Sequence, residues 1–232
     1  MRKIADQDEV RLTAGRALLL GMSLVLTLAL AAAVLSLPED QPRLAQVALE
    51  RLPESGVGNA VTAVLLNFRG YDTLLEVAVL LLAIIGIWSV ARTARVWIKR
   101  PDTPILRAFM RFIVPLMPIM AGYLLWIGAD ETGGAFQGGA VLGGMGILWI
   151  AAAVWLPRRG GRALLRPLLA IGLLAFLIAA TWMLLVRGNF FEYPPERAKD
   201  IILIIEGAAM LSIGATLALL FVGGAPQQEE SS

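Results

Sequence analysis

The chain has 232 residues, of which 58% are hydrophobic and only 16% are charged, and its mean hydropathy is +0.73. A soluble domain of this size could not cover so much apolar surface, so lipid is the expected solvent, and we expect no nucleic-acid partner. The formal net charge of +2 by itself says little. The absence of Cys and His excludes thiolate-bound iron–sulfur clusters, zinc sites, His-ligated haem and Ser–His or Cys–His catalysis, so we expect no cofactor, metal site or catalytic residue.

Six apolar segments predict transmembrane helices, because a hydrocarbon core of about 30 Å takes about 20 helical residues to cross. The first segment follows two basic residues, as a secretory signal would. It is nevertheless longer than the usual signal core of about 7–15 residues and other spans follow it, so we interpret it as a retained helix. The predicted fold class is an all-α polytopic membrane protein. The segments are approximately 17–37, 74–90, 112–127, 139–156, 164–186 and 201–222.

The distribution of Lys and Arg predicts the orientation. Fourteen of the 20 basic residues lie before the first span, between spans two and three, and between spans four and five, if Arg166 at the start of the fifth span is counted with the last group; the other six lie in the alternate loops. By the positive-inside rule, both termini are expected in the cytoplasm.

The connection at residues 38–70 is too long for a turn and contains two further helical patterns. In the second, Val61, Val64, Leu65 and Phe68 recur with helical spacing, a stripe suited to the membrane interface or a partner helix. We predict a cytoplasmic N-terminus at 1–16, a two-span module at 17–100, a four-span module at 101–222 and a disordered tail at 223–232.

Two carboxylates begin the second span. Asp72 and Glu76 are four residues apart and share a helix face, where they repel each other and partial burial would favour their neutral forms. Both are candidates for an ion path, although Arg69 can neutralise Asp72. In the alternative interpretation, Thr73 and Glu76 form a capping box that only satisfies the helix N-terminus.

A third carboxylate, Glu206, follows an apolar run in the last span, where no helix cap explains it. An unpaired carboxylate at this depth is costly, so it should be protonated, paired with a neighbouring helix, or in contact with water. Two roles remain open: a proton relay and a hydrogen bond to a neighbouring subunit.

A glycine-rich segment opens the fourth span. The pairs Gly134/Gly138 and Gly139/Gly143 have the small-xxx-small spacing that lets helix backbones approach closely, and Phe136 lies between the first two. A broken helix with its amides facing an ion is the alternative. We favour packing, because the segment contains no ionisable residue beyond those at its outer edge.

Two stretches resemble one group of membrane complexes. Residues 54–76, ESGVGNAVTAVLLNFRGYDTLLE, resemble the C-terminal region of the A subunit of Mrp-type multisubunit Na⁺/H⁺ antiporters and a small subunit of membrane-bound hydrogenases. Residues 103–212 resemble the antiporter B subunit, in which a PGGGFQGG segment opens a helix. Here that segment reads Thr132-Gly133-Gly134-Ala135-Phe136-Gln137-Gly138-Gly139; Thr132-Gly133 stands where the family often has Thr-Pro, and Ala135 replaces a Gly.

The resemblance implies a fusion of an A-subunit tail with a B subunit, in a bacterial or archaeal plasma membrane. It implies other membrane subunits, Na⁺ or another monovalent cation, H⁺ and lipid as partners. In that family the Glu matching Glu76 is important for transport. No Lys lies inside a predicted span, so the chain cannot supply the Lys residues that move protons. It would therefore act as an accessory subunit beside a subunit that pumps protons. A component of a hydrogenase- or complex I-related respiratory assembly and a purely structural scaffold are the alternatives.

Overall fold

The computed structural model describes residues 2–36, 44–90, 104–151 and 161–221. Nearly all of these residues are helical and none lies in a strand, so the predicted all-α class is confirmed. Five helices are long and apolar enough to cross a membrane, and a sixth apolar helix has 17 described residues. The predicted tail, the expected end of the fourth span and the boundary near residue 100 lie outside the described residues.

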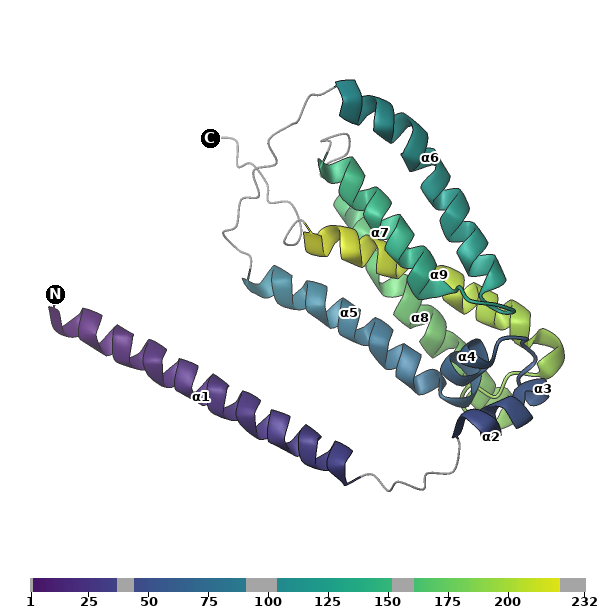
Figure 1. Cartoon of the computed structure of the whole chain (residues 1–232), viewed down its shortest axis with the longest axis horizontal. Helices are drawn as coiled ribbons and strands as arrows, with labels where there is room; N and C mark the ends of the chain where they lie inside the picture. Colours follow the sequence, from purple (N-terminus) through teal and green to yellow (C-terminus); the bar gives the residue numbers. More distant parts are fainter. Residues whose placement is uncertain (1, 37–43, 91–103, 152–160, 222–232) are drawn as a thin grey trace. The chain divides into compact units, whose positions relative to one another are not determined.

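The chain divides into two compact units, Met1–Gln46 and Val47–Ser232. The first consists mainly of helix α1 (Arg2–Leu35), drawn in purple in Figure 1. The helix begins well before the expected residue 17, because most residues of the charged segment ahead of the apolar run are good helix formers. From residue 16 to residue 35 its side chains are exposed, as suits a helix surrounded by lipid or by other subunits.

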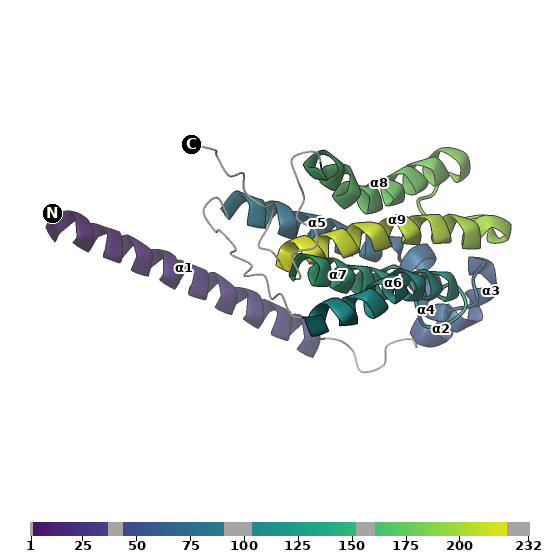
Figure 2. The ribbon, with the colours of Figure 1, turned by 90° about the horizontal axis from the view of Figure 1, so that it is seen from above.

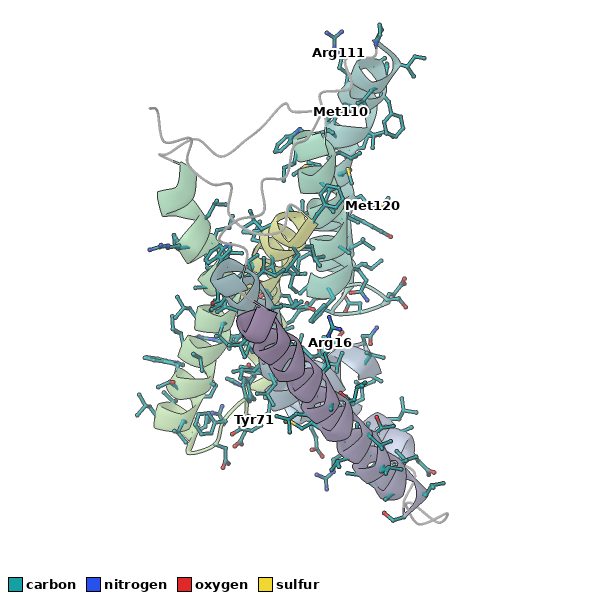
Figure 3. All side chains as sticks on the ribbon, turned by 90° about the vertical axis from the view of Figure 1, so that its left-hand side faces the viewer. Arg16, Tyr71, Met110, Arg111 and Met120 are labelled. Atoms are coloured by element: carbon teal, nitrogen blue, oxygen red, sulfur yellow. The ribbon has the colours of Figure 1, made fainter. Side chains whose placement is uncertain are left out.

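The second unit contains the remaining candidate spans. They are α5 (Gly70–Val90), α6 (Pro104–Ile127), α7 (Ala135–Ala151), α8 (Gly161–Arg187) and α9 (Pro195–Phe221). Arg111 and Tyr71 lie near opposite ends of this unit in Figure 3, and the Met120 side chain of α6 is exposed on its outer surface.

Helix α9 is the central element of the second unit. It packs against α5, α6, α7 and α8, and Figure 2 shows it between α7 and α8. Its span is 56% buried, against 11% for α6. Ala209, Ser212 and Gly214 on α9 have small side chains, so neighbouring helices can approach closely without an apolar driving force from water.

Short helices cover the end of the second unit at which α5 begins. They are α3 (Leu52–Ser55), α4 (Ala60–Ala63) and the π-helical turn η1 (Val64–Phe68), whereas α2 (Leu44–Glu50) contains the boundary between the two units. Asn59 caps α4 by accepting hydrogen bonds from the Val61 and Thr62 amides. Gly56 adopts a φ of +72° against Pro195, where a Cβ atom would collide with the backbone of α9.

Candidate functional site

Helix α7 begins after a sharp turn that brings its N-terminus against α9. Gly134 has a φ of +110°, which L side chains rarely adopt, and its N–H donates to the Leu124 carbonyl at 2.8 Å. A Cβ atom at Gly134 would lie 2.5 Å from Glu206 Oε1. The position therefore requires glycine for its backbone conformation and also for space.

Glu206 is held at this turn by one of its two carboxyl oxygens. Counting from Pro195 at 1.5 Å per residue, it lies about 16 Å along α9. Its Oε1 accepts a hydrogen bond from the Ala135 N–H at 3.3 Å, and the helix N-terminus carries partial positive charge that favours a carboxylate. Only 6% of the residue is exposed, and Oε2 has no hydrogen-bond partner among the described residues.

A cavity of about 250 Å³ adjoins Glu206. Residues of α4, η1 and α5 line one side, and residues of the turn before α7, of α7 itself, α8 and α9 line the other. The lining consists of Val61, Thr62, Leu65, Leu66, Thr73, Gly133, Ala135, Phe136, Gln137, Phe176, Glu206 and Ala209. Among these residues Glu206 is the one ionisable side chain, so the two motifs found in the sequence meet beside a single buried carboxylate.

The polar lining of the cavity presents mainly hydrogen-bond acceptors. Thr62 Oγ1 donates to the Gly128 carbonyl at 2.5 Å, and Thr73 Oγ1 donates to the Leu65 carbonyl at 2.7 Å. Because a hydroxyl has one hydrogen, only its lone pairs remain for a further partner. The acceptor Leu65 belongs to the π-helical turn η1, and such turns are frequent at functional sites.

Backbone hydrogen bonds join the two sides of the cavity. The Gly58 and Asn59 amides both donate to the Ala129 carbonyl at 3.0 Å, and Asn59 Nδ2 donates to the Glu131 carbonyl at 2.5 Å. Together with the Thr62–Gly128 bond, these contacts attach the segment before η1 to the turn between α6 and α7.

Asp72 and Glu76 do not line this cavity. Asp72 pairs with Arg69 at 2.6 Å, as the sequence predicts. Glu76 is exposed on α5, where it can meet a partner subunit or an ion. The capping-box interpretation is wrong, because α5 begins at Gly70 and the Thr73 hydroxyl bonds to η1 rather than to the helix N-terminus.

The remaining glycines of the motif face other helices closely. A Cβ atom at Gly138 would lie 2.6 Å from Met210 Sδ, one at Gly139 would lie 2.8 Å from Ile213 Cβ, and one at Gly143 would lie 2.9 Å from Leu217 Cβ. All three neighbours belong to α9. Phe136 and Gln137 belong to the first turn of α7 and are exposed at the rim of the cavity.

Sequence reasoning missed Thr62 and did not recognise that Thr73 faces a cavity. The signal for Thr62 was a polar residue on the face opposite the apolar stripe, and that face is the buried one. Within the described ranges, no cluster of three or more His, Cys, Asp or Glu side chains could hold a metal ion.

Residues 105–225, more than half of the chain, match a family model described as a domain related to the MnhB subunit of Na⁺/H⁺ antiporters. The chain belongs to this family. In this MnhB-related chain, residues 12–104 match the model of MbhE, a component of the membrane-bound hydrogenase (MBH), so an MbhE-like region precedes the MnhB-related domain. The protein is therefore a multi-pass membrane protein of the Mrp/MnhB type.

Two solved complexes contain chains of similar fold. One is the membrane-bound sulfane sulfur reductase (MBS), an archaeal respiratory membrane complex, with 26% identity, a TM-score of 0.64, and coverage of 88% of this chain and 94% of that one. The other is the Mrp complex from Dietzia sp. DQ12-45-1b, with 20% identity, a TM-score of 0.63, and coverage of 94% of this chain and 27% of that one. No curated protein sequence matches the chain.

Proposed function

We propose that this MnhB-related chain is an accessory membrane subunit of an Mrp-type multisubunit antiporter, in which it contributes to assembly and to coupled movement of H⁺ and Na⁺ or another monovalent cation. The observation that carries the proposal is the match of more than half of the chain to the MnhB-related domain. The membrane is the plasma membrane of a bacterium or archaeon, and both termini face the cytoplasm.

The distribution of charge supports an accessory role. Each Lys of the chain lies outside the predicted spans, so the alternating Lys and Glu residues of a proton-pumping subunit must come from another chain. This chain offers instead an exposed carboxylate at Glu76 and a buried one at Glu206. With no His or Cys to build a nucleophile–base pair, we expect no catalytic site in the chain.

The exposed surface supports other membrane subunits as partners. Large apolar side chains on α1, α5 and α6 are exposed, among them Leu20, Val79 and Phe112. In a membrane these side chains contact lipid or neighbouring helices, and Glu76 lies on the same exposed side of α5 as Val79 and Leu75. A carboxylate facing lipid would be costly, so Glu76 is best accommodated against a partner subunit, where it could contact a transported ion.

The alternative is a membrane-arm component of a respiratory complex related to the hydrogenase. The MBS match favours it, because this chain covers 94% of the MBS chain at 26% identity. The two candidates predict different neighbours: an antiporter contains membrane subunits alone, whereas a respiratory complex also carries iron–sulfur proteins.

Purification of the intact complex in mild detergent, followed by identification of its subunits by mass, tests the proposal. We expect membrane subunits alone, and Na⁺-dependent proton movement when the complex is returned to vesicles. Copurified iron–sulfur subunits would establish the respiratory alternative. A complex of membrane subunits that moves no cation, with or without this chain, would leave the chain a structural scaffold.

A further inference from the structure

Glu206 lines the cavity, and one of its carboxyl oxygens, Oε2, is buried and lacks a hydrogen-bond partner among the described residues. The other carboxyl oxygen, Oε1, accepts a hydrogen bond from the Ala135 N–H. A buried unpaired carboxylate oxygen is costly unless a proton, a cation or water satisfies it. The residue is 6% exposed, so bulk solvent does not satisfy it.

The chemistry of the cavity selects a cation. The hydroxyls of Thr62 and Thr73 donate their hydrogens to backbone carbonyls, so each hydroxyl oxygen has only lone pairs left for a ligand. Gln137 adds an amide oxygen. No Lys or Arg is present in the lining to neutralise Glu206. A carboxylate with neutral oxygens and water is the donor set preferred by hard cations, and about 250 Å³ leaves room for an ion with several water molecules.

The cavity also reaches the outer surface of the second unit. Val61, Leu65, Phe136 and Gln137 line it and are themselves exposed. An ion could therefore enter from a path along the surface of α4 and α7 without separation of α7 from α9.

We propose that this cavity binds a monovalent metal cation such as Na⁺, with the Glu206 carboxylate as the anionic ligand and with Gln137, Thr62 and Thr73 as neutral oxygen ligands. A proton on the carboxylate and the cation compete, because protonation removes the negative charge that binds the cation. The inference deepens the proposed function and rests on it for the identity of the ion. It also places an ion site where the MbhE-like region meets the MnhB-related domain.

Carbodiimide labelling of the purified complex tests this site directly. Dicyclohexylcarbodiimide is apolar and reacts with protonated carboxyl groups in apolar surroundings. Mass analysis of peptides would locate the adduct in NaCl and in choline chloride of equal ionic strength. We expect Glu206 to be labelled in choline chloride, and Na⁺ to slow the labelling by a factor of 1 + [Na⁺]/Kd, which is about elevenfold at ten times Kd. Exposed Glu196 serves as the specificity control, because its carboxylate faces water, and it should stay unlabelled in both salts.

Two variants show whether the protection arises in the cavity. Gln137→Leu keeps the size of an exposed first-turn side chain and removes its oxygen, and it should raise the Na⁺ concentration needed for protection, measured relative to the variant's own labelling in choline chloride. Thr73→Val should do the same, whereas Thr73→Ser should behave as the wild type. Complex yield on a native gel confirms that each variant is assembled.

Three outcomes would overturn the inference. They are an intact complex in which Glu206 is never labelled, equal labelling in Na⁺, K⁺, Li⁺ and choline salts, and protection that persists unchanged in both Gln137→Leu and Thr73→Val. Failure of the proposed function would look different. A complex with redox subunits and no Na⁺/H⁺ exchange could still show protection of Glu206 by Na⁺, and that result would reject the antiporter role and keep the site.

Discussion

Gly134 and Glu206 are in direct contact, although 71 residues separate the Glu206 carboxylate from the amide it binds at the start of α7. The missing side chain of Gly134 makes room for Glu206 Oε1, and the turn at Gly134 aims the Ala135 N–H at the same oxygen. The start of α7 and the carboxylate of α9 are therefore one structural unit.

Gly134→Ala should damage this unit. A Cβ atom would meet Glu206 Oε1 at 2.5 Å in a backbone region with a φ of +110°, so we expect a loss of about 1–3 kcal/mol in stability. The measurement is the melting temperature of the purified complex. Gly86→Ala is the matched control, since nothing lies within 4 Å of its position, and it should melt with the wild type. Equal melting of Gly134→Ala would contradict the contact.

Gly139→Leu and Gly143→Leu should lower the yield of assembled complex, rather than lower transport by a complex that still assembles. Cβ atoms at these positions would lie 2.8 Å and 2.9 Å from α9 side chains, so a Leu must separate α7 from α9. Complex yield on a native gel is the measurement, with Gly122→Leu as a control in open space. Normal assembly with transport alone lost would favour a broken-helix role for the glycine segment.

Glu76→Gln should lower Na⁺/H⁺ exchange steeply in membrane vesicles while the complex stays intact. Gln keeps the shape of the side chain but cannot titrate or carry charge, and no capping role remains to explain Glu76. Asp72→Asn should have a weaker effect, because Arg69 already neutralises Asp72 at 2.6 Å. Glu196→Gln is the control for an exposed carboxylate. Undiminished exchange by Glu76→Gln over a range of pH would sink the prediction.

Reporter fusions should place both termini in the cytoplasm. Fourteen of the 20 basic residues lie on that side if the chain crosses the membrane six times. A periplasmic reporter signal from the C-terminus, or from a fusion within residues 158–166, would refute six crossings.

Tyr193 should make the protein sensitive to alkaline pH. Its phenol lies in the connection before α9 with no hydrogen-bond partner among the described residues, and burial raises its pKa above the ordinary value of 10.0. The unfolded chain therefore loses this proton first, so stability is full below pH 10 and falls as pH rises beyond it. Tyr193→Phe should reduce the loss of folding stability above pH 10, because Phe has no proton to lose. It should also raise the free energy of unfolding by about 1 kcal/mol at neutral pH, since a buried hydroxyl without a hydrogen-bond partner is removed. Melting temperatures at pH 7 to 11 would show the difference, and identical curves would contradict it.

Local sequence patterns predicted the helices and the ion pair between neighbouring turns of the chain. Apolar runs of about 20 residues identify spans because the bilayer leaves few alternatives, and Arg69 pairs with Asp72 because three residues separate them on one helix. The glycine spacing predicted close helix packing for the same reason: a side-chain position on a helix follows from its number. Helix starts were less predictable, since polar residues such as Asp72 extend a helix beyond its apolar part.

Only the tertiary structure decided what surrounds the three carboxylates. The sequence around Thr73 and Glu76 is compatible with a helix cap, and the contact that excludes a cap, from Thr73 to the Leu65 carbonyl, depends on a π-helical turn that no apolar periodicity reveals. Glu206 has an apolar neighbourhood in sequence, yet its Oε1 accepts a hydrogen bond from an amide of α7 and the residue lines a cavity built partly by α4 and η1. Contacts between distant segments depend on how helices pack, and packing is a property of shapes that meet across the whole unit rather than of any one segment.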